Sequence, residues 1–312
     1  MQHLINEQMN LPSPVSLVIV NHNAGLLLTD CIRSAQSQVQ EIIVIDNAST
    51  DTSLAEIEQR FSSKEKQLLT IKRLDQNIGF AAACNIGIQE TRSPFVLFLN
   101  PDCMLPVNAI DRLMQVLQSD SQIGMVGGRL LNADGSEQGG GRRAIPTPWR
   151  ALVRATGLYR LERFWPNLFF DFHLHKQPLP LNPIDVEAIS GALMLVRRDA
   201  IDEVGVWDEG YFLHCEDLDW CMRFRHKGWR IVFVPDVQVL HHKGACSQAR
   251  PLFVAWHKHK GMLRFYQKFF RDQYPSVLMW LVSTGVWFRL GAVVFFHYLS
   301  QLGRFCLRQR RG

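Results

Sequence analysis

Four short apolar runs, separated by stretches with helical spacing, constrain the fold of this chain more than any other feature. The runs are residues 15–20, 42–45, 68–74 and 95–99. Runs of β-branched residues and leucine of this length are typical of strands that are buried on both faces. The intervening residues 26–36, 54–61 and 81–91 have the apolar spacing of helices. This alternation predicts right-handed crossovers and a mostly parallel central sheet, which is an α/β fold.

Short polar side chains follow the end of each of these strands. They occupy residues 21–23, 46–51, 77–79 and 100–102. Because ligands of open α/β sheets bind outside the carboxyl ends of the strands, we expect the four loops to converge on a nucleotide site. Neither G-x-G-x-x-G nor G-x-x-x-x-G-K-[ST] occurs, so the phosphate charge must be met another way. A divalent cation on Asp102 would meet it, although Asn-Pro-Asp is also a common turn.

The second half of the chain is predicted to continue the same fold. Strands are expected at residues 123–131, 193–196, 229–234 and 237–240, and a helix at 215–226. Asn132 to Gly135 is expected to form a hairpin-type turn. Residues 139–143 are either a flexible loop that closes over a donor or a simple solvated loop. Residues 144–183 are rich in proline and poorly patterned, with a short helix expected at 149–161.

Three carboxylates at the start of one predicted helix are candidates for acid–base chemistry. Glu216, Asp217 and Asp219 fall in its first turn, where the helix dipole stabilises negative charge. Capping explains Glu216 and Asp219 equally well, whereas Asp217 is predicted to take a proton from a hydroxyl group. A negative charge on Glu216 would make Asp217 more basic. An imidazole from His241 could complete a metal shell with Asp102.

These motifs, in this order, carry a resemblance to a known family. They are Asn21-His22-Asn23, Asp46 to Asp51, Asn77 to Ala81, Asn85-Ile86-Gly87, Phe98 to Asp102, Ser190-Gly191-Ala192, Glu216 to Trp220 and His241 to Gly244. Together they span residues 15–247. Over that length the chain resembles the family 2 inverting glycosyltransferases with a GT-A fold. It is most similar to the rhamnosyltransferase-like members that build bacterial surface polysaccharides.

The resemblance implies a donor site at the carboxyl edge of the sheet. Asp46 would recognise the pyrimidine base, and Asn77 and Gly79 would line the nucleotide pocket. The full set of implied donor-binding residues is Asn21, Asp46, Asn47, Ser49, Asn77, Gly79, Asn100, Asp102 and Gly191. Asp102 would be the metal-binding end of a DxD-like motif whose first acidic position is here Asn100. An amide binds a hard cation less strongly than a carboxylate does, so Asp102 would contribute more to metal binding than Asn100.

The resemblance also implies the reaction and its catalytic residues. Asp217 would be the general base, Trp207 and Glu216 would contact the acceptor, and His241 would hold Mg²⁺ or Mn²⁺ together with Asp102. His242 is the alternative ligand. The implied enzyme is an inverting, metal-dependent glycosyltransferase that moves a sugar from a nucleotide-diphosphate donor to a polyprenyl-diphosphate-linked glycan. The sugar is plausibly L-rhamnose from dTDP-rhamnose, and another hexose or galactofuranose is the alternative.

The C-terminal residues predict contact with a membrane. The net charge of +5 conceals an asymmetry, because twelve Lys and Arg and one acidic residue lie from His241 onward. Residues 251–271 mix bases with aromatics, and residues 276–299 carry one charge, Arg289. This pattern favours an in-plane or re-entrant anchor on the cytoplasmic face of the inner membrane, although a full span or packing against protein stays open. Long apolar interruptions argue against nucleic acid.

The polar N-terminus and the cysteines predict a cytoplasmic protein. Residues 1–10 lack the apolar stretch of a signal peptide, and the seven cysteines form no C-x-x-C pair. We expect free thiols, with Cys215 and Cys221 as small buried hydrophobes. Residues 1–130 are predicted to bind the donor, 131–247 to supply the acceptor site and base, and 248–312 to meet the membrane. Two other functions stay open, a sugar nucleotidyltransferase and a non-catalytic membrane scaffold, and the oligomeric state is undetermined.

Overall fold

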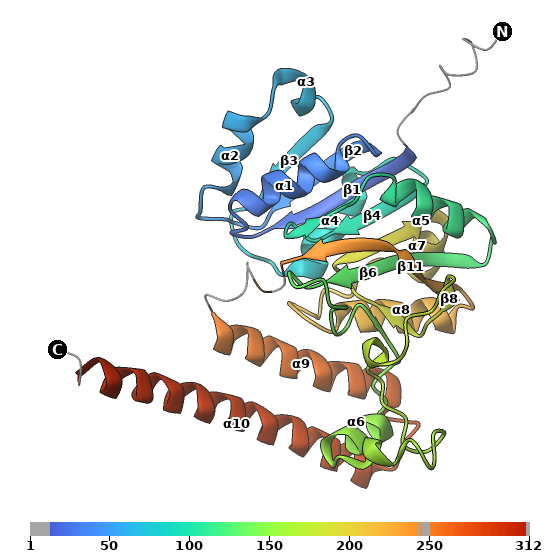
Figure 1. Ribbon diagram of the computed structural model, residues 1–312, viewed down its shortest axis with the longest axis vertical. Coiled ribbons are helices and arrows are strands. Elements are labelled where there is room, and N and C mark those ends of the chain that lie inside the picture. The colour runs from blue at the N-terminus through green and yellow to red at the C-terminus, as the bar shows by residue number, and fades with distance from the viewer. Residues whose placement is uncertain (1–12, 243, 245–249, 310–312) are drawn as a thin grey trace. The chain divides into compact units, whose positions relative to one another are not determined.

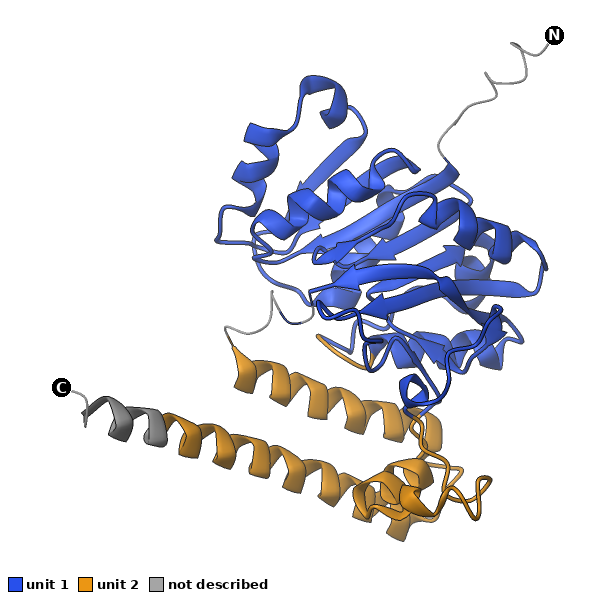
Figure 2. Cartoon of the chain, in the orientation of Figure 1, with its two compact units in different colours: residues 1–145, 173–212, 216–246 blue, residues 146–172, 213–215, 247–312 orange. Residues whose placement is uncertain are grey.

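The chain forms two compact units (Figure 2). Unit 1 consists of residues 1–145, 173–212 and 216–246, and unit 2 of residues 146–172, 213–215 and 247–312. The computed structural model describes residues 13–242, 244 and 250–309, with side chains up to residue 301. Residues 146–172, which the sequence placed with the acceptor half, therefore cluster with the C-terminal helices.

A nine-stranded sheet is the centre of unit 1 (Figure 1). Its strands are β1 (Ser13–Asn21), β2 (Val39–Asp46), β3 (Leu69–Arg73), β4 (Phe95–Leu99), β5 (Cys103–Met104), β6 (Ile123–Leu131), β8 (Ile184–Asp185), β10 (Leu193–Arg197) and β11 (Arg230–His241). Strands β3, β2, β1 and β4 are neighbours in parallel register, which confirms the predicted α/β crossovers. Strand β10 runs antiparallel between β4 and β6, and β11 is parallel to β6.

Helices cover both faces of this sheet. They are α1 (Leu26–Ala35), α2 (Ser53–Arg60), α3 (Ser63–Lys66), α4 (Phe80–Glu90), α5 (Ala109–Gln118), α7 (Arg198–Val204) and α8 (Glu216–His226). Leu17 and Ile19 of β1 share a core cluster with α1 and α5. Val18 points to the other face, as strand geometry requires, where a Cβ added at Gly87 of α4 would lie 2.3 Å from its Cγ1. Glycine at this position therefore lets α4 approach the sheet closely.

Strand β11 corrects one prediction. The sequence predicted two strands, 229–234 and 237–240, with a break at Pro235. The structure has one strand whose register shifts between Val234 and Gln238. Proline has no N–H to donate, so the ladder skips that position without ending. The predicted end of α8 is confirmed, because Gly228 adopts a φ of +85° and its N–H bonds to the carbonyl of Arg225.

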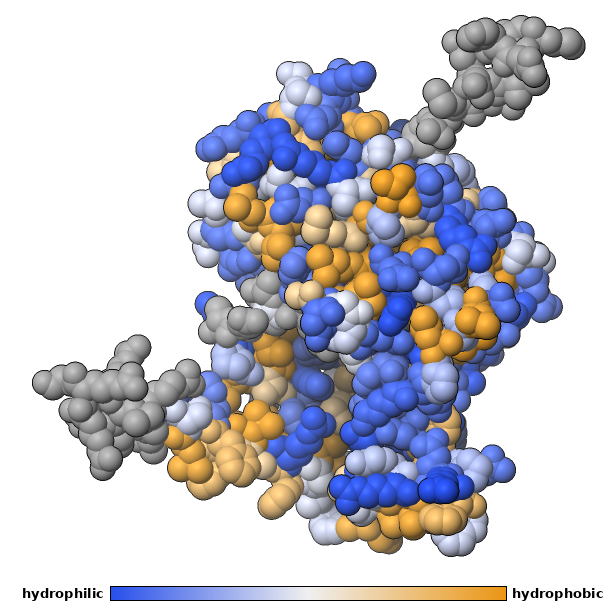
Figure 3. Space-filling view, in the orientation of Figure 1, coloured by the Kyte–Doolittle hydropathy of each residue, from blue (hydrophilic) through white to orange (hydrophobic). Residues whose placement is uncertain are grey.

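Unit 2 is helical. Its elements are α6 (Pro148–Ala155), the 3₁₀ turn η1 (Leu158–Leu161), α9 (Pro251–Phe270) and α10 (Ser276–Gln309). The helix predicted at 149–161 is shorter and breaks at Gly157, where φ is +79°. Residues 276–301 of α10 are long and apolar enough to cross a membrane, and much of their apolar surface is exposed (Figure 3).

Candidate active site

The loops after β1 and β2 are joined through one buried amide. Asn21 is fully buried, and its Nδ2 lies 2.8 Å from Asp46 Oδ1 and 3.0 Å from Ser49 Oγ. Asp46 also accepts a hydrogen bond from the Ser49 backbone N–H. Asn21 therefore holds the carboxylate of Asp46 in place through a buried hydrogen bond. Any influence of Asn21 on a donor would pass through Asp46.

A second amide joins the loop after β2 to the start of α4. The Nδ2 of Asn47 donates to the carbonyl of Gly79, and its Oδ1 accepts from the N–H of Ile78. Asn77 caps the same turn by accepting from the Gly79 N–H. Gly79 has a φ of +89°, and a Cβ there would lie 2.7 Å from the Phe212 carbonyl oxygen. The loops after β1, after β2 and before α4 thus lie together, as predicted, and hydrogen bonds of the Asn21 and Asn47 side chains join them.

A buried carboxylate and a buried imidazole meet beside the loop after β4. Asp102 Oδ1 and His241 Nε2 are 3.2 Å apart, and both residues are buried. His241 Nδ1 lies 2.6 Å from Gln138 Oε1. The Gln138 amide is oriented by its Nε2, which donates to Asn132 Oδ1, so its oxygen must accept from His241 Nδ1. Nε2 is consequently the ring nitrogen that is left to face Asp102.

This pair has the donor chemistry of a divalent metal site. Neighbouring ligands of an octahedral ion lie about 3 Å apart, so the 3.2 Å separation fits Mg²⁺ or Mn²⁺. Asn100 Nδ2 lies 3.4 Å from the same imidazole nitrogen. Cys103 completes a group of three possible ligands with Asp102 and His241, although a thiol suits a hard cation poorly. The imidazole that meets Asp102 is that of His241, whereas His242 contacts it through a backbone N–H.

The carboxylate of Asp217 is held by three donors at the start of α8. Its Oδ2 pairs with the guanidinium of Arg143 and accepts from the N–H of Gly191 at 3.3 Å. Its Oδ1 accepts from the N–H of Leu218 at 2.8 Å. Both members of the ion pair remain partly exposed. Asp217 is therefore oriented by three donors and remains within reach of solvent.

Glu216, the residue before Asp217, lies in a buried environment that lacks these donors. The residue is buried, and its Oε2 has no hydrogen-bond partner among the residues that the structure describes. Burial, reinforced by the negative charge of Asp217, raises the pKa of Glu216 to about 8. We expected a negative charge on Glu216 to make Asp217 more basic. The structure instead makes Glu216 the neutral member of the pair at pH 7, because it lacks the donors that surround Asp217.

Residues 191 and 192 bring the metal pair and the carboxylate together. The Ala192 carbonyl accepts from the Asn100 N–H, and the Gly191 N–H donates to Asp217. The antiparallel register of β10 with β4 produces this arrangement, since Leu193 lies opposite Leu99. The loop that carries Asp102 and the carboxylate of Asp217, 115 positions apart in sequence, are thus both bonded to one dipeptide.

Trp207 lies beneath this dipeptide. A Cβ on Gly191 would lie 3.8 Å from its ring, which is buried and packs on Trp220 at a centroid distance of 4.2 Å. Asn85 fixes the backbone of Trp207 through both its N–H and its carbonyl. Trp207 is predicted to contact the acceptor, and its ring is buried, with an Nε1 that has no hydrogen-bond partner within the described part of the chain.

Two residues that orient the site escaped the sequence analysis. Arg143 lies in residues 139–143, which were interpreted only as a loop, and Gln138 directly precedes them. No local pattern identifies Gln138, and Arg143 is one of two adjacent arginines.

Backbone strain is an independent indication of a functional site in the loops after β1 and β2, because Asn23 and Ala48 adopt φ near +57°.

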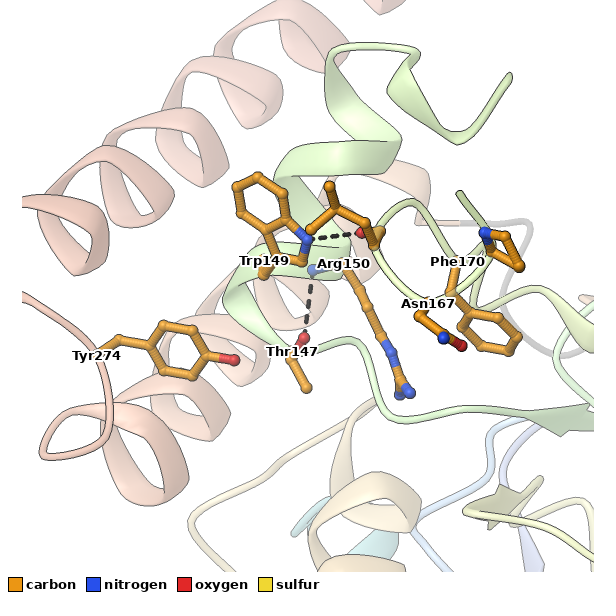
Figure 4. Close-up of a pocket in the computed structure, with 8 residues that line it drawn as sticks. Thr147, Trp149, Arg150, Asn167, Phe170 and Tyr274 are labelled. Atoms are coloured by element: carbon orange, nitrogen blue, oxygen red, sulfur yellow. Dashed lines mark hydrogen bonds between the residues drawn. The ribbon is translucent and has the colours of Figure 1, made fainter. Parts of the chain in front are cut away.

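Unit 2 contains a separate pocket of about 240 Å³ (Figure 4). It is lined by Thr147, Trp149, Arg150, Pro166, Asn167, Leu168, Phe170 and Tyr274. Trp149 Nε1 donates to the Leu168 carbonyl, and Arg150 lies over the ring of Phe170. None of the predicted site residues lines this pocket.

Two family models match the chain. Residues 16–205 match the model described as Glycosyl transferase family 2, and residues 165–307 match Glycosyl transferase family group 2. The chain is 27% identical over 249 residues to N-acetylglucosaminyl-diphospho-decaprenol L-rhamnosyltransferase of Mycobacterium tuberculosis. The aligned region covers 75% of this chain and 78% of the relative. It is 32% identical over 77 residues to Rhamnosyltransferase WbbL of Escherichia coli, which covers 23% of this chain and 29% of the relative.

Solved structures share the fold at low identity. GalNAc-T7, crystallised with UDP, GalNAc and Mn²⁺, gives a TM-score of 0.56 at 21% identity over 75% of this chain and 44% of its own. The mannosyltransferase PcManGT from Pyrobaculum calidifontis, in complex with GDP-Man and Mn²⁺, gives 0.55 at 15% identity over 89% and 72%. The predicted GT-A fold is confirmed. Because the first family model spans more than half of the chain, this protein is a glycosyltransferase and belongs to glycosyl transferase family 2.

Proposed function

We propose that this protein is an inverting glycosyltransferase with Asp217 as its general base. The observation that carries the proposal is that residues 191 and 192 contact both the loop of the buried Asp102–His241 pair, through Asn100, and the oriented carboxylate of Asp217. An inverting displacement needs one base on one face of the sugar and support for the leaving group on the other.

The donor would lie along the carboxyl edge of β1, β2 and β4. Asp46 is positioned there to accept hydrogen bonds from a pyrimidine, and Asn47 and Gly79 shape the adjoining loop. Asn100, Asp102 and His241 would face the diphosphate and hold Mg²⁺ or Mn²⁺. When bound, such an ion stabilises the charge that develops on a departing nucleoside diphosphate.

Asp217 would then act on the acceptor. Its carboxylate accepts the proton of an acceptor hydroxyl as that oxygen forms a bond to the anomeric carbon. The bond from the anomeric carbon to the diphosphate oxygen breaks in the same step, and its electron pair leaves with the nucleoside diphosphate. One displacement inverts the anomeric centre. Glu216, neutral at pH 7, would donate a hydrogen bond to the acceptor.

The acceptor is proposed to be a glycan on a polyprenyl diphosphate. The name of the mycobacterial relative specifies a diphospho-decaprenol acceptor and an L-rhamnosyl group. The exposed apolar surface of α10 supports a site of action at a membrane, for which we propose the cytoplasmic face of the inner membrane. L-rhamnose from dTDP-rhamnose is the proposed donor sugar, for transfer during the biosynthesis of a bacterial surface polysaccharide.

A panel of nucleotide sugars, supplied with a polyprenyl-diphosphate-linked acceptor and with or without EDTA, tests the proposal. We expect release of a nucleoside diphosphate with one donor, and loss of turnover in EDTA that Mn²⁺ or Mg²⁺ restores. Release of pyrophosphate would instead indicate a nucleotidyltransferase. No turnover with any donor would contradict the enzymatic proposal.

A further inference from the structure

Residues 137–143, here called the strap, contact both ends of the proposed site. Gln138 binds the imidazole of His241 at one end. Arg143 binds the carboxylate of Asp217 at the other. Five positions of chain thus separate the residue that meets the metal pair from the residue that meets the proposed base.

The Gln138 end determines how His241 presents its ring. Gln138 Nε2 donates to Asn132 Oδ1 at 3.0 Å and to the His241 carbonyl at 3.3 Å. These two bonds leave Oε1 as the acceptor for His241 Nδ1 at 2.6 Å. A histidine that binds a metal through Nε2 needs this tautomer, and its partner at Nδ1 commonly governs metal affinity.

The Arg143 end determines how Asp217 presents its oxygens. Arg143 lies in β7 (Arg142–Arg143), which pairs with β9 (Ala188–Ile189) two residues before Gly191. Its guanidinium and the Gly191 N–H both bind Oδ2 of Asp217. The carboxylate is therefore fixed by the strap and by the dipeptide 191–192, whose other residue bonds to Asn100.

The strap itself is anchored between its two ends. Arg142 forms a buried ion pair with Glu137 at 2.7 Å and donates to the Gln177 carbonyl at 3.0 Å. The Gly141 carbonyl accepts from the Ser190 N–H. Of the residues 139–143 that were interpreted from sequence as a flexible or solvated loop, residues 141–143 are thus each bonded to other parts of unit 1.

We infer that Gln138 and Arg143 are positioning residues that tie the metal-binding histidine and the general base to one segment. This inference rests on the proposed function. It assigns Gln138 to the affinity of the metal site and Arg143 to the proton-transfer step. The two residues should therefore affect different measurements, although they lie in one loop.

Binding of Mn²⁺ alone to the full-length protein, followed by electron paramagnetic resonance, tests the Gln138 end. Gln138→Leu should weaken Mn²⁺ binding about 10- to 100-fold, because Nδ1 loses its acceptor. Gln138→Glu keeps an acceptor and should restore most of the affinity. Asp134→Asn, at the exposed tip of the same hairpin, should bind Mn²⁺ as the wild type does. Equal affinity of Gln138→Leu and wild type would overturn this assignment.

Steady-state kinetics test the Arg143 end. Arg143→Gln should lower kcat about tenfold or more and leave both the donor KM and the Mn²⁺ affinity unchanged. Arg143→Lys should recover part of kcat, since it restores the positive charge. A rise in donor KM with unchanged kcat would overturn the role of Arg143.

Measurements on the wild type distinguish a failure of the proposed function from a failure of the role assigned to the strap. If the unmodified protein neither binds Mn²⁺ nor transfers any sugar, the proposed function fails, and the role of the strap fails with it. If it does both, and Gln138→Leu and Arg143→Gln behave as the wild type does, the role of the strap fails alone. Circular dichroism of each variant excludes misfolding as the cause of a loss.

Discussion

At the scale of single residues, Glu216 should make stability depend on pH. Its raised pKa of about 8 means that the folded state binds a proton more tightly than the unfolded state does. Its contribution is fully present below the unfolded pKa and is lost as pH rises toward 8, by at most roughly 1 kcal/mol per pH unit. Glu216→Gln cannot ionise at this position. The free energy of unfolding of Glu216→Gln minus that of the wild type should therefore increase from pH 5 to pH 8. Urea denaturation across this range measures the difference.

Asp202→Asn is the matched control for that experiment. Asp202 is exposed on α7, and its substitution likewise replaces a carboxyl group with an amide. The control should follow the wild type at every pH. A constant offset between Glu216→Gln and the wild type would show that Glu216 is ionised throughout, contrary to its buried environment.

Gly79 gives a second prediction at the same scale. Gly79→Ala would place a Cβ 2.7 Å from the Phe212 carbonyl oxygen at a φ of +89°. Gly135 has a similar φ of +79° with no atom within 4 Å, so Gly135→Ala isolates the backbone strain. We expect Gly135→Ala to cost about 1–2 kcal/mol and Gly79→Ala about 1–3 kcal/mol more. Equal losses in urea denaturation would contradict the close approach of Phe212.

At the scale of elements, the packing of α4 on β1 can be tested by a double-mutant cycle. Gly87→Ala gains about 1 kcal/mol of helix propensity but forces a Cβ against Val18. We expect net destabilisation, because overpacking costs about 1–3 kcal/mol. Val18→Ala removes the obstructing methyl groups. The double variant should therefore be more stable than the sum of the two single effects predicts, and strict additivity would contradict the contact.

The strands were predicted from sequence to different extents. Strand β4 and strand β6 begin and end where the apolar runs predict, because β4 is fully buried and β6 is buried at all but two of its positions. Strand β11 was divided at Pro235, since a single sequence does not distinguish a bulge from a break. The helix predicted at 149–161 was too long because Gly157 interrupts it.

The residue types of the candidate site could be proposed from sequence, but the hydrogen bonds and ion pairs that connect them could not. Asp102 and His241 were expected as a pair on chemical grounds, and they lie 3.2 Å apart. The ion pair of Arg143 with Asp217 spans 74 positions, and only the folded sheet brings such residues together. The difference between Glu216 and Asp217 depends on burial, which residue type does not encode.

At the scale of the whole molecule, the surface of unit 2 predicts binding to an anionic membrane. Phe288 and Phe296 of α10 are 81% and 67% exposed, and the C-terminal region is strongly basic. We expect the full-length protein to float with phosphatidylglycerol vesicles. Phe288→Asp with Phe296→Asp should reduce its partition coefficient by about tenfold or more, since each ring loses its burial in lipid.

Val107 provides the control for vesicle binding. It is 85% exposed in unit 1, so Val107→Asp alters a comparable apolar side chain outside α10. This variant should float as the wild type does. Failure of the wild type to float, or equal loss in both variants, would contradict a membrane role for α10.

The role of Asp217 is the centre of the account, and turnover by Asp217→Asn tests it most directly. The variant keeps the shape of the side chain and removes its capacity to accept a proton. We predict a fall in kcat of about 10²- to 10⁴-fold with an unchanged dissociation constant for the nucleotide-sugar donor. Full activity of Asp217→Asn, measured with the donor that the wild type uses, would contradict the assignment of the base.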